Sequence, residues 1–430
     1  MITSTVPLDD TAVRRIRTDF AELAKPVNGR PLVYLDSGAT SLKPAPVLDA
    51  ERAFAETYTA AVHRGAHTLA AEATELFEQA RETVAAFVGA ASDELVWTSN
   101  ATEAINLVAY AIGNATAGRG GEAAARFRLS PGDEIVVTEA EHHANLIPWQ
   151  ELAARTGAVL RAIPVDDEGV LRLDEATAII GERTRLVAFA HVSNVTAAIA
   201  PVAELVDLAH AAGALVVLDA CQSVPHMPVD FHALDVDFAV FSGHKMLAPT
   251  GIGALYGRRE LLNALPPFLT GGSMITTVTL ERAEYLPAPQ RFEAGTQRIS
   301  QAIAFAAACD YLSGIGLDHI AEHEHALGRR LLEGLTQIDG IRVLGPRDAD
   351  QRTGLASFDV DGVHAHDAGQ FLDDKGIAVR VGHHCAQPLH RHLGVTASTR
   401  ASSYLYNTLD DVELFLEALA DVRPFFGAGS

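Results

Sequence analysis

The chain has 430 residues, 48% of them hydrophobic and 20% charged, which is typical of a well-packed soluble protein too long for a single small core. The formal net charge of −22 argues against a protein that binds nucleic acid through its phosphates, because such binding needs clustered Lys and Arg. The cysteines at 221, 309 and 385 suit neither a disulfide framework nor a C-x-x-C metal motif, so we expect a reducing, cytoplasmic setting and no bound metal. With no apolar segment near the N-terminus and none of roughly 20 residues elsewhere, we expect neither a secretory signal nor a membrane anchor.

Short apolar runs rich in Val, Ile and Leu alternate with amphipathic segments through the first two thirds of the chain. The runs are ELVWTS (94–99), EIVVTEAE (134–141), AVLRAIPV (158–165), RLVAFAHVS (185–193), ALVVLDACQS (214–223) and VDFAVFSG (236–243). This alternation predicts an α/β fold with a mostly parallel sheet flanked by helices. Ligands of such sheets bind beyond the carboxyl ends of the strands, so we expect the functional residues directly after these runs.

The pattern changes at about residue 298. A long helical stretch over 298–338 is followed by short strands and a closing helix over 410–422, which predicts a smaller α+β domain. We therefore divide the chain into an N-terminal segment packing with the small domain (1–32), a large domain (33–297) and a small domain (298–430). The Gly- and Ala-rich segment 113–133 is predicted to be a surface loop.

An aspartate and a lysine follow two of the predicted strands. Asp219 closes the run ALVVLD, and Lys245 lies in SGHK directly after VDFAVF. If both strands belong to the sheet, the two side chains meet at its carboxyl edge. A buried carboxylate facing a reactive lysine is what a pyridoxal phosphate site needs, with the lysine as Schiff base and the aspartate keeping the pyridine nitrogen protonated.

Two further segments suit the same cofactor. The sequence SNAT (99–102) lies between a strand and a helix, where free N–H groups and the helix dipole favour a phosphate, although an ordinary N-cap explains the same residues. Ser242 and His244 are additional candidate phosphate donors. His142 follows another strand and could lie against the cofactor and move a proton; chemistry alone leaves open whether His142 or His143 faces inward.

At this point the chain resembles a known family along nearly its whole length. The matching motifs are YLDSGATSLKP, HRGAHTLA, TEAINLVA, EHHANLIPWQ, HVSNV, LDACQS, SGHKMLAPTGIG, RVGHHCAQP and ASSYLYNT. They resemble the SufS-like (group II) cysteine desulfurases of the class V aminotransferase family, which are fold-type I pyridoxal phosphate enzymes. The chain departs from the family pattern at Ala101, where relatives carry Thr or Gly, and in VTAAIAP, where an alanine replaces a usual glycine.

The resemblance implies a role for each matching position. Lys245 matches the Schiff-base lysine, Asp219 the partner of the pyridine nitrogen, His142 the ring-stacking histidine and Gln222 the neighbour of the phenolic oxygen. The implied phosphate site comprises Ala101, Thr102, Ser242 and His244, with Thr296 lent by the second subunit of a homodimer. Asn194 and Arg400 match the groups that hold the substrate carboxylate, and Arg380 matches a second active-site arginine.

Cys385, in the sequence RVGHHCAQP, admits three interpretations. As a metal ligand it would have to join His383 and His384, but neighbouring side chains of an extended chain point to opposite faces. Burial as a small apolar residue suits Cys309 and Cys221 better than a cysteine in a polar loop beside histidines. The third interpretation is a nucleophile, whose thiolate those histidines could favour.

The resemblance implies that L-cysteine is converted to L-alanine with a persulfide on Cys385. The sulfur would pass to an acceptor protein of the SufE or SufU type for iron–sulfur cluster assembly. The alternatives are a selenocysteine lyase and a non-catalytic scaffold that kept the fold. His364 and His366 are solvated or capping groups in one interpretation, and in the other His366 ligates zinc carried by the acceptor.

Overall fold

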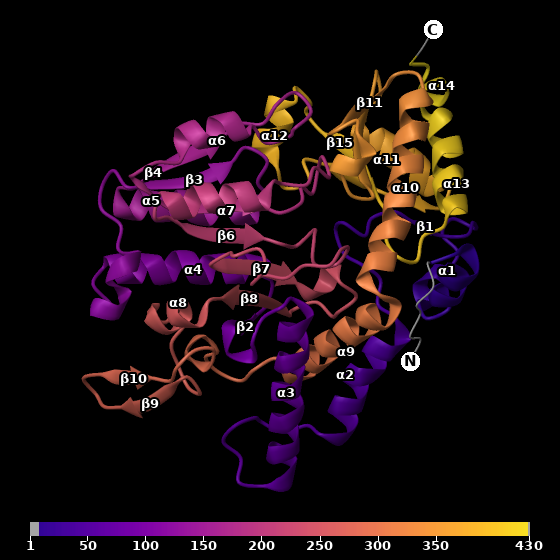
Figure 1. Cartoon of the computed structure of the whole chain (residues 1–430). Coiled ribbons are helices and arrows are strands. Elements are labelled where there is room, and N and C mark those ends of the chain that lie inside the picture. The colour runs from indigo at the N-terminus through magenta and orange to yellow at the C-terminus, as the bar shows by residue number, and fades with distance from the viewer. Residues whose placement is uncertain (1–7, 429–430) are drawn as a thin grey trace.

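A seven-stranded sheet in the order β2-β8-β7-β6-β5-β3-β4 forms the centre of the larger part of the molecule (Figure 1). The computed structural model describes residues 8–428. The strands are β2 (Leu95–Thr98), β3 (Glu134–Thr138), β4 (Val159–Ile163), β5 (Thr184–Ala190), β6 (Leu215–Asp219), β7 (Phe238–Ser242) and β8 (Gly253–Gly257). β8 is antiparallel to both its neighbours and the remaining pairs are parallel. Every apolar run predicted from the sequence forms one of these strands, and the α/β fold class is confirmed.

Helices cover both faces of this sheet, because neighbouring residues of its strands point to opposite sides. In β6, Val216 and Leu218 join one apolar cluster and Val217 joins the other. The first cluster contains residues of α2 (Ala45–Thr57), α3 (Thr68–Phe87), α6 (Leu173–Ile179), α7 (Val202–Ala211) and α9 (Ile299–Ile315). The second contains residues of α4 (Ala101–Thr116), α5 (Ile147–Thr156) and α8 (Arg259–Ala264).

A second, four-stranded antiparallel sheet lies in the C-terminal part, in the order β11-β12-β15-β14. Its strands are β11 (Ile341–Leu344), β12 (Leu355–Val360), β14 (Arg380–Gly382) and β15 (Ser398–Ser402). An apolar cluster joins it to α10 (Leu317–Gln337), α11 (Ala365–Asp374), α13 (Leu409–Ala420) and α14 (Val422–Phe426). The short helix α12 (Gln387–His392) packs instead against residues near the central sheet, including Val165 and Val195.

The N-terminal helix α1 (Asp10–Arg17) lies near the N-terminal end of α13 (Figure 1). Arg17 forms an ion pair with the buried Asp411 at 2.7 Å, and Arg14 pairs with Asp410 at 2.8 Å. β1 (Val33–Tyr34) runs parallel to β13 (Ile377–Ala378), so the chain just beyond α1 also contacts the C-terminal part. The domain boundaries at residues 32 and 297 stay a prediction. Residues 1–7 of the predicted N-terminal segment lie outside the described range.

Two expectations about local structure need correction. The helical stretch 298–338 is divided between α9 and α10 at Gly316, whose φ of 99° no helix contains. The segment 113–133 is not one loop: residues 113–116 complete α4, and the 3₁₀ helix η3 (Glu122–Phe127) buries Ala124 and Phe127. Apolar side chains within an Ala- and Gly-rich segment favour such a short helix against the core.

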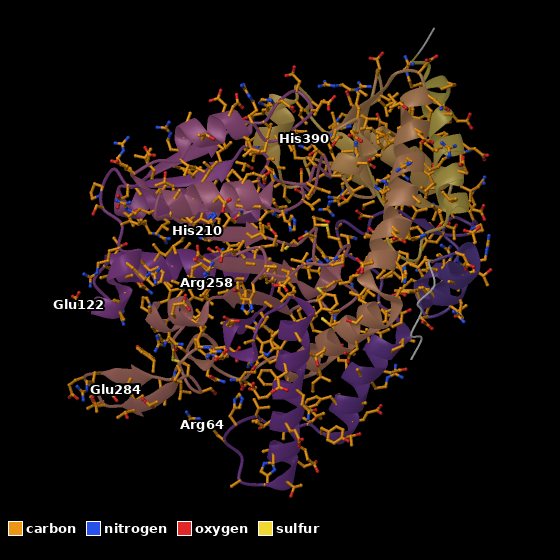
Figure 2. The ribbon with its side chains drawn as sticks, viewed as in Figure 1. Arg64, Glu122, His210, Arg258, Glu284 and His390 are labelled. Carbon is orange, nitrogen blue, oxygen red and sulfur yellow. The ribbon has the colours of Figure 1, made fainter. Side chains whose placement is uncertain are left out.

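A hairpin of β9 (Ile275–Val278) and β10 (Ala283–Tyr285) projects from the large sheet's side of the molecule (Figures 1 and 2, where Glu284 is labelled). Leu280 at its tip is fully exposed. Within residues 8–428, none of the helices has the length and apolar character required to cross a bilayer.

Candidate active site

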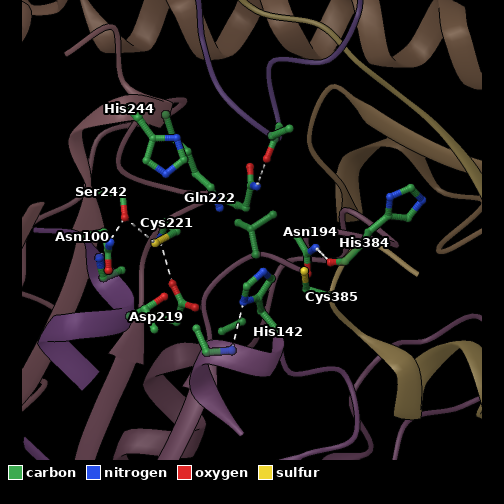
Figure 3. A pocket seen from close by; sticks show the side chains of 18 of the residues that line it. Asn100, His142, Asn194, Asp219, Cys221, Gln222, Ser242, His244, His384 and Cys385 are labelled. Carbon is green, nitrogen blue, oxygen red and sulfur yellow. Dashed lines mark hydrogen bonds between the residues drawn. The ribbon is translucent and has the colours of Figure 1, made fainter. Parts of the chain in front are cut away.

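A cavity of about 380 Å³ opens where the central sheet faces the C-terminal part (Figure 3). All the residues predicted for cofactor and substrate line it except Thr296: Ala101, Thr102, His142, Asn194, Asp219, Gln222, Ser242, His244, Lys245, Arg380, Cys385 and Arg400. Thr296 is exposed in the segment before α9. Its predicted role is in a second subunit's site, so its position in one chain leaves that prediction open.

Asp219 and Lys245 reach the cavity from neighbouring parallel strands. Asp219 is the last residue of β6 and pairs in register with Val240 of β7, while Lys245 ends η5 (Gly243–Lys245), which follows β7 directly. The Asp219 carboxylate is buried and its Oδ1 accepts a hydrogen bond from the Cys221 amide at 3.0 Å. Its Oδ2 has no hydrogen bond from the described residues, which leaves it available to a protonated ring nitrogen.

The N-terminus of α4 forms another part of the wall. Asn100 is its N-cap, with Oδ1 accepting from the Glu103 amide at 2.9 Å, and the Ala101 amide donates to Ser242 Oγ at 2.9 Å. A Cβ on Gly253 would lie 2.7 Å from Asn100 Cα, so only glycine lets β8 approach the helix this closely. The N-cap interpretation is therefore correct, and the same helix end lines the cavity, where its dipole favours a phosphate.

Of the two adjacent histidines, His142 lines the cavity and His143 does not. The Ala144 amide donates to His142 Nδ1 at 3.1 Å, so the neutral ring carries its proton on Nε2. Burial, with the charge of Lys245, lowers the pKa of His142 to about 4. Burial and Lys245 likewise lower the pKa of His244 to about 4, so both rings are neutral at pH 7.

Arg400 is the buried cation of the cavity, with 2% of its surface exposed. Its Nη1 donates to Asn194 O at 3.0 Å, and its Nη2 lies 3.5 Å from Asp36 Oδ1. Burial lowers the pKa of Arg400 to about 10, against the opposing effect of Asp36, and the side chain stays charged at pH 7. Its Nε is buried without an acceptor among residues 8–428. The guanidinium lines the cavity, where its charge and planar set of donors suit a ligand carboxylate.

Cys385 lies on a loop whose backbone is held by the large sheet's side of the cavity. The His143 amide donates to Cys385 O at 2.6 Å, and Asn194 Nδ2 donates to His384 O at 2.6 Å. The amide of Asn194, predicted to bind substrate, thus already holds this loop with one of its hydrogens. His384 and Cys385 both adopt left-handed backbone conformations, with φ of 49° and 58°, which few non-glycine residues take up.

The other two cysteines differ from Cys385 in burial. Cys309 is buried in α9, and burial raises the pKa of its thiol well above the usual value. Cys221 borders the cavity next to Asp219, and burial raises its thiol pKa as well. Cys385 is half-buried, and it is the cysteine whose loop faces the cavity from the C-terminal part.

Sequence reasoning did not single out two acidic residues of this region. Asp36 neighbours Arg400, and Glu141 is fully buried beside His142, where it accepts hydrogen bonds from Thr138 Oγ1 at 2.5 Å and Asn145 Nδ2 at 2.6 Å. Burial raises the pKa of Glu141 to about 8. Both residues occur in the motifs YLDSGATSLKP and EHHANLIPWQ, but nothing in those motifs indicates their partners.

The residues of the cavity fit pyridoxal phosphate. A lysine and a buried carboxylate with a free oxygen stand at the ends of neighbouring strands, a helix N-terminus offers amides to an anion, and a neutral histidine lies between Asp219 and Cys385 in the view of Figure 3. Together with the mostly parallel sheet, this site defines a fold-type I pyridoxal phosphate enzyme.

Comparison with known proteins agrees with this class. Residues 33–415 match the family Aminotransferase class-V, and the chain belongs to this family of pyridoxal phosphate enzymes. A probable cysteine desulfurase 2 of Mycobacterium leprae is 56% identical over 429 residues, covering 99% of this chain and 100% of that protein. The apo structure of a cysteine desulfurase from Thermococcus onnurineus has a TM-score of 0.89 at 40% identity, covering 98% and 99% of the two chains. The cysteine desulfurase CsdA from Escherichia coli, solved with an S-sulfonic acid, has a TM-score of 0.86 at 37% identity, covering 96% and 98%.

Proposed function

We propose that this protein is a cysteine desulfurase that converts L-cysteine to L-alanine and retains the sulfur as a persulfide on Cys385. The observation that carries the proposal is the presence of Cys385 in the same cavity as Lys245, Asp219 and Arg400. A transaminase needs the lysine and the aspartate but no thiol. The desulfurases of Mycobacterium leprae and Thermococcus onnurineus resemble the chain over nearly all of its length, which supports the same activity.

The chain's own residues divide the work as follows. Bound pyridoxal phosphate supplies an electron sink for the substrate's α-carbon. Lys245 would attach the cofactor, and its amine would move the proton at the substrate's Cα. Asp219 would keep the cofactor's ring nitrogen protonated through its free Oδ2, and the neutral His142 would contact the ring. The α4 N-terminus with Thr102, Ser242 and His244 would hold the phosphate.

Arg400 orients the substrate through its carboxylate, so that the substrate sulfur faces the Cys385 loop. The Cys385 thiolate attacks that sulfur; an S–S bond forms, the substrate Cβ–S bond breaks, and its electron pair stays with Cβ, which takes up one proton to become the methyl group of alanine. In sum, a thiol and L-cysteine give a persulfide and L-alanine, with no external oxidant or reductant. Gln222 and Arg380 complete the predicted binding set; Gln222 Nε2 donates to Gly38 O at 2.8 Å.

The test compares Cys385→Ala with Cys309→Ala in the cofactor-loaded enzyme. Cys385→Ala should retain the cofactor's visible absorbance but release no alanine from L-cysteine and gain no sulfur atom by mass spectrometry. Cys309 is buried in α9 outside the cavity, so Cys309→Ala should behave as the parent enzyme. Selenocysteine serves as second substrate: if Cys385→Ala still releases alanine from both amino acids at the parent rate, the nucleophile role is wrong.

We further propose a homodimer in which Thr296 reaches the partner's phosphate site, and a sulfur acceptor of the SufE or SufU type that supplies iron–sulfur cluster assembly. The exposed position of Thr296 before α9 is compatible with such a contact. Sedimentation of the loaded enzyme tests the dimer, since a fully active monomer would exclude it. His364 is the N-cap of α11, with Nδ1 accepting from the His366 amide at 3.2 Å; the exposed His366 is the side chain left for an acceptor's zinc.

A further inference from the structure

A buried serine connects two histidines directly behind the Cys385 loop. Ser398, the first residue of β15, has its Oγ 3.0 Å from His384 Nε2 and 2.9 Å from His390 Nε2. His390 lies on α12 (labelled in Figure 2), and its Nδ1 is 3.0 Å from Ala386 O. Ser398, His384 and His390 are all buried, with at most 5% of each residue exposed. The cluster therefore holds the residues on both sides of Cys385: the side chain of His384 before it and the carbonyl of Ala386 after it.

The hydrogen bonds of this cluster can run in one direction only. Ala386 O is an acceptor, so His390 Nδ1 carries a proton and the Nε2 of the neutral ring accepts. The single Ser398 hydroxyl proton is then donated to His390 Nε2, and Ser398 Oγ accepts from His384 Nε2–H. Burial, with the charges of Arg400 and Arg380, lowers the pKa of His384 to about 2, and burial lowers the pKa of His390, so both rings remain neutral at pH 7.

This cluster faces a backbone that is unfavourable without support. His384 and Cys385 are both left-handed, with φ of 49° and 58°, a conformation that is strained for residues other than glycine. The bonds from Asn194 and His143 hold the loop's carbonyls from the side of the large sheet. The serine cluster holds the His384 side chain and the Ala386 carbonyl from the other side, so the loop is fixed between two sets of contacts.

We propose that Ser398 is a positioning residue for sulfur transfer, acting through His384 and His390 to keep the Cys385 thiol in its attacking geometry. The role in sulfur transfer rests on the proposed desulfurase function, whereas the effect on the position of the thiol does not. Ser398 itself does not line the cavity and touches no reacting atom. Removing its hydroxyl leaves a buried donor on His384 and a buried acceptor on His390 without partners, which favours rearrangement of the loop.

The experiment uses Ser398→Ala, Ser398→Thr and Ser357→Ala in the cofactor-loaded enzyme. Ser357 is a matched control, because it is equally buried in the adjoining strand β12 and its hydroxyl has no hydrogen-bond partner among the described residues. Two rates are measured: alkylation of Cys385 by iodoacetamide, read from the mass of its peptide, and single-turnover persulfide formation from L-cysteine. The cofactor's absorbance and the thermal midpoint verify that each variant is folded and loaded.

For Ser398→Ala we expect about tenfold slower persulfide formation and a severalfold change in the alkylation rate, with the cofactor absorbance unchanged. Ser398→Thr, which keeps the hydroxyl, should restore both rates to within about twofold, and Ser357→Ala should alter neither. Parental rates in Ser398→Ala, no rescue by threonine, or the same loss in Ser357→Ala would overturn the proposal.

If Ser398→Ala does not fold, His390→Gln decides instead. Glutamine keeps a polar group for Ser398 but removes the Nδ1–H donor to Ala386 O. It should shift the alkylation rate of Cys385, and an unchanged rate would overturn the proposal. A parent enzyme that forms no persulfide at all would refute the proposed function, while the alkylation rates would still test the position of the thiol.

Discussion

Replacing Arg400 by lysine is expected to raise KM for L-cysteine about 30-fold and to leave kcat within about twofold. Nη1 of Arg400 is anchored on Asn194 O at 3.0 Å and Nη2 lies 3.5 Å from Asp36 Oδ1, which fixes the plane of the guanidinium where it lines the cavity. Lysine keeps the positive charge but presents a single point of contact. The substitution therefore removes one charge-assisted bond from a site that otherwise stays positive.

The size of the effect follows from that one bond. A hydrogen bond to a charged group contributes about 1.5–3 kcal/mol, and a loss of about 2 kcal/mol corresponds to about 30-fold in affinity. The carboxylate does not react, so the contact is equally strong in the ground state and the transition state, and its loss appears in KM.

Steady-state alanine release over a range of L-cysteine concentrations measures both constants. Arg352→Lys is the matched control: Arg352 is also buried in the C-terminal part, but it donates to Pro346 O and Leu355 O and does not line the cavity. Its substitution should lower the thermal midpoint without changing KM. A fall in kcat with unchanged KM in Arg400→Lys, or an equal KM increase in Arg352→Lys, would refute the assignment of Arg400 to the substrate carboxylate.

Three further results are expected. Lys245→Ala should lose the covalently attached cofactor and its visible absorbance together with all alanine release, and turnover at the parent rate would exclude Lys245 as the cofactor lysine. Stability should fall as the pH drops from about 6.5 to about 4, because burial lowers the pKa of His191 to about 4 and the unfolded chain takes up a proton that the folded chain refuses. His191→Gln should make the free energy of unfolding depend less steeply on pH, by up to about 1.4 kcal/mol per pH unit, and the thermal midpoint measured against pH should show the flatter decline. An unaltered slope would assign the decline to other groups. With L-cysteine alone, alanine release should show a burst of one equivalent per site followed by a slow phase that a thiol reductant or acceptor accelerates. The reason is the short Cys385 loop: β14 ends at Gly382 and α12 begins at Gln387, which limits the reach of the sulfur to about 10–12 Å from the strand end. A linear time course that no acceptor accelerates would contradict this prediction.

The sequence was sufficient to predict the framework of the site, for a topological reason. Asp219 and Lys245 follow apolar runs, and parallel strands place all their carboxyl ends at one edge, so two residues 26 positions apart could be paired before any coordinates were known. The same reasoning indicated the helix end that we propose for the phosphate and a pair of histidines after another strand, whereas the choice of His142 over His143 came from the resemblance to the family.

The contacts across the cavity could not be predicted in that way. Arg400 meets Asp36, and Ser398 meets His384 and His390, through packing between the C-terminal sheet and the rest of the chain, which no local periodicity encodes. The division at Gly316 was missed because helical periodicity continues on both sides of a residue whose φ is set by the packing of α9 and α10. The φ of 62° at Ala197 is the left-handed conformation that favours glycine, which accounts for the usual glycine of the family pattern, while nothing in the structure explains the alanine of this chain.

The two bonds that hold the Cys385 loop from the large sheet's side end on main-chain oxygens, those of His384 and Cys385. Every amino acid carries such an oxygen, so these bonds do not depend on which side chain stands at position 385. Serine, alanine or selenocysteine could be placed there and presented to the cavity from the same backbone. The residue at position 385 can thus be exchanged without loss of these two backbone hydrogen bonds, so the intrinsic reactivity of sulfur, selenium and oxygen nucleophiles can be compared at constant backbone geometry.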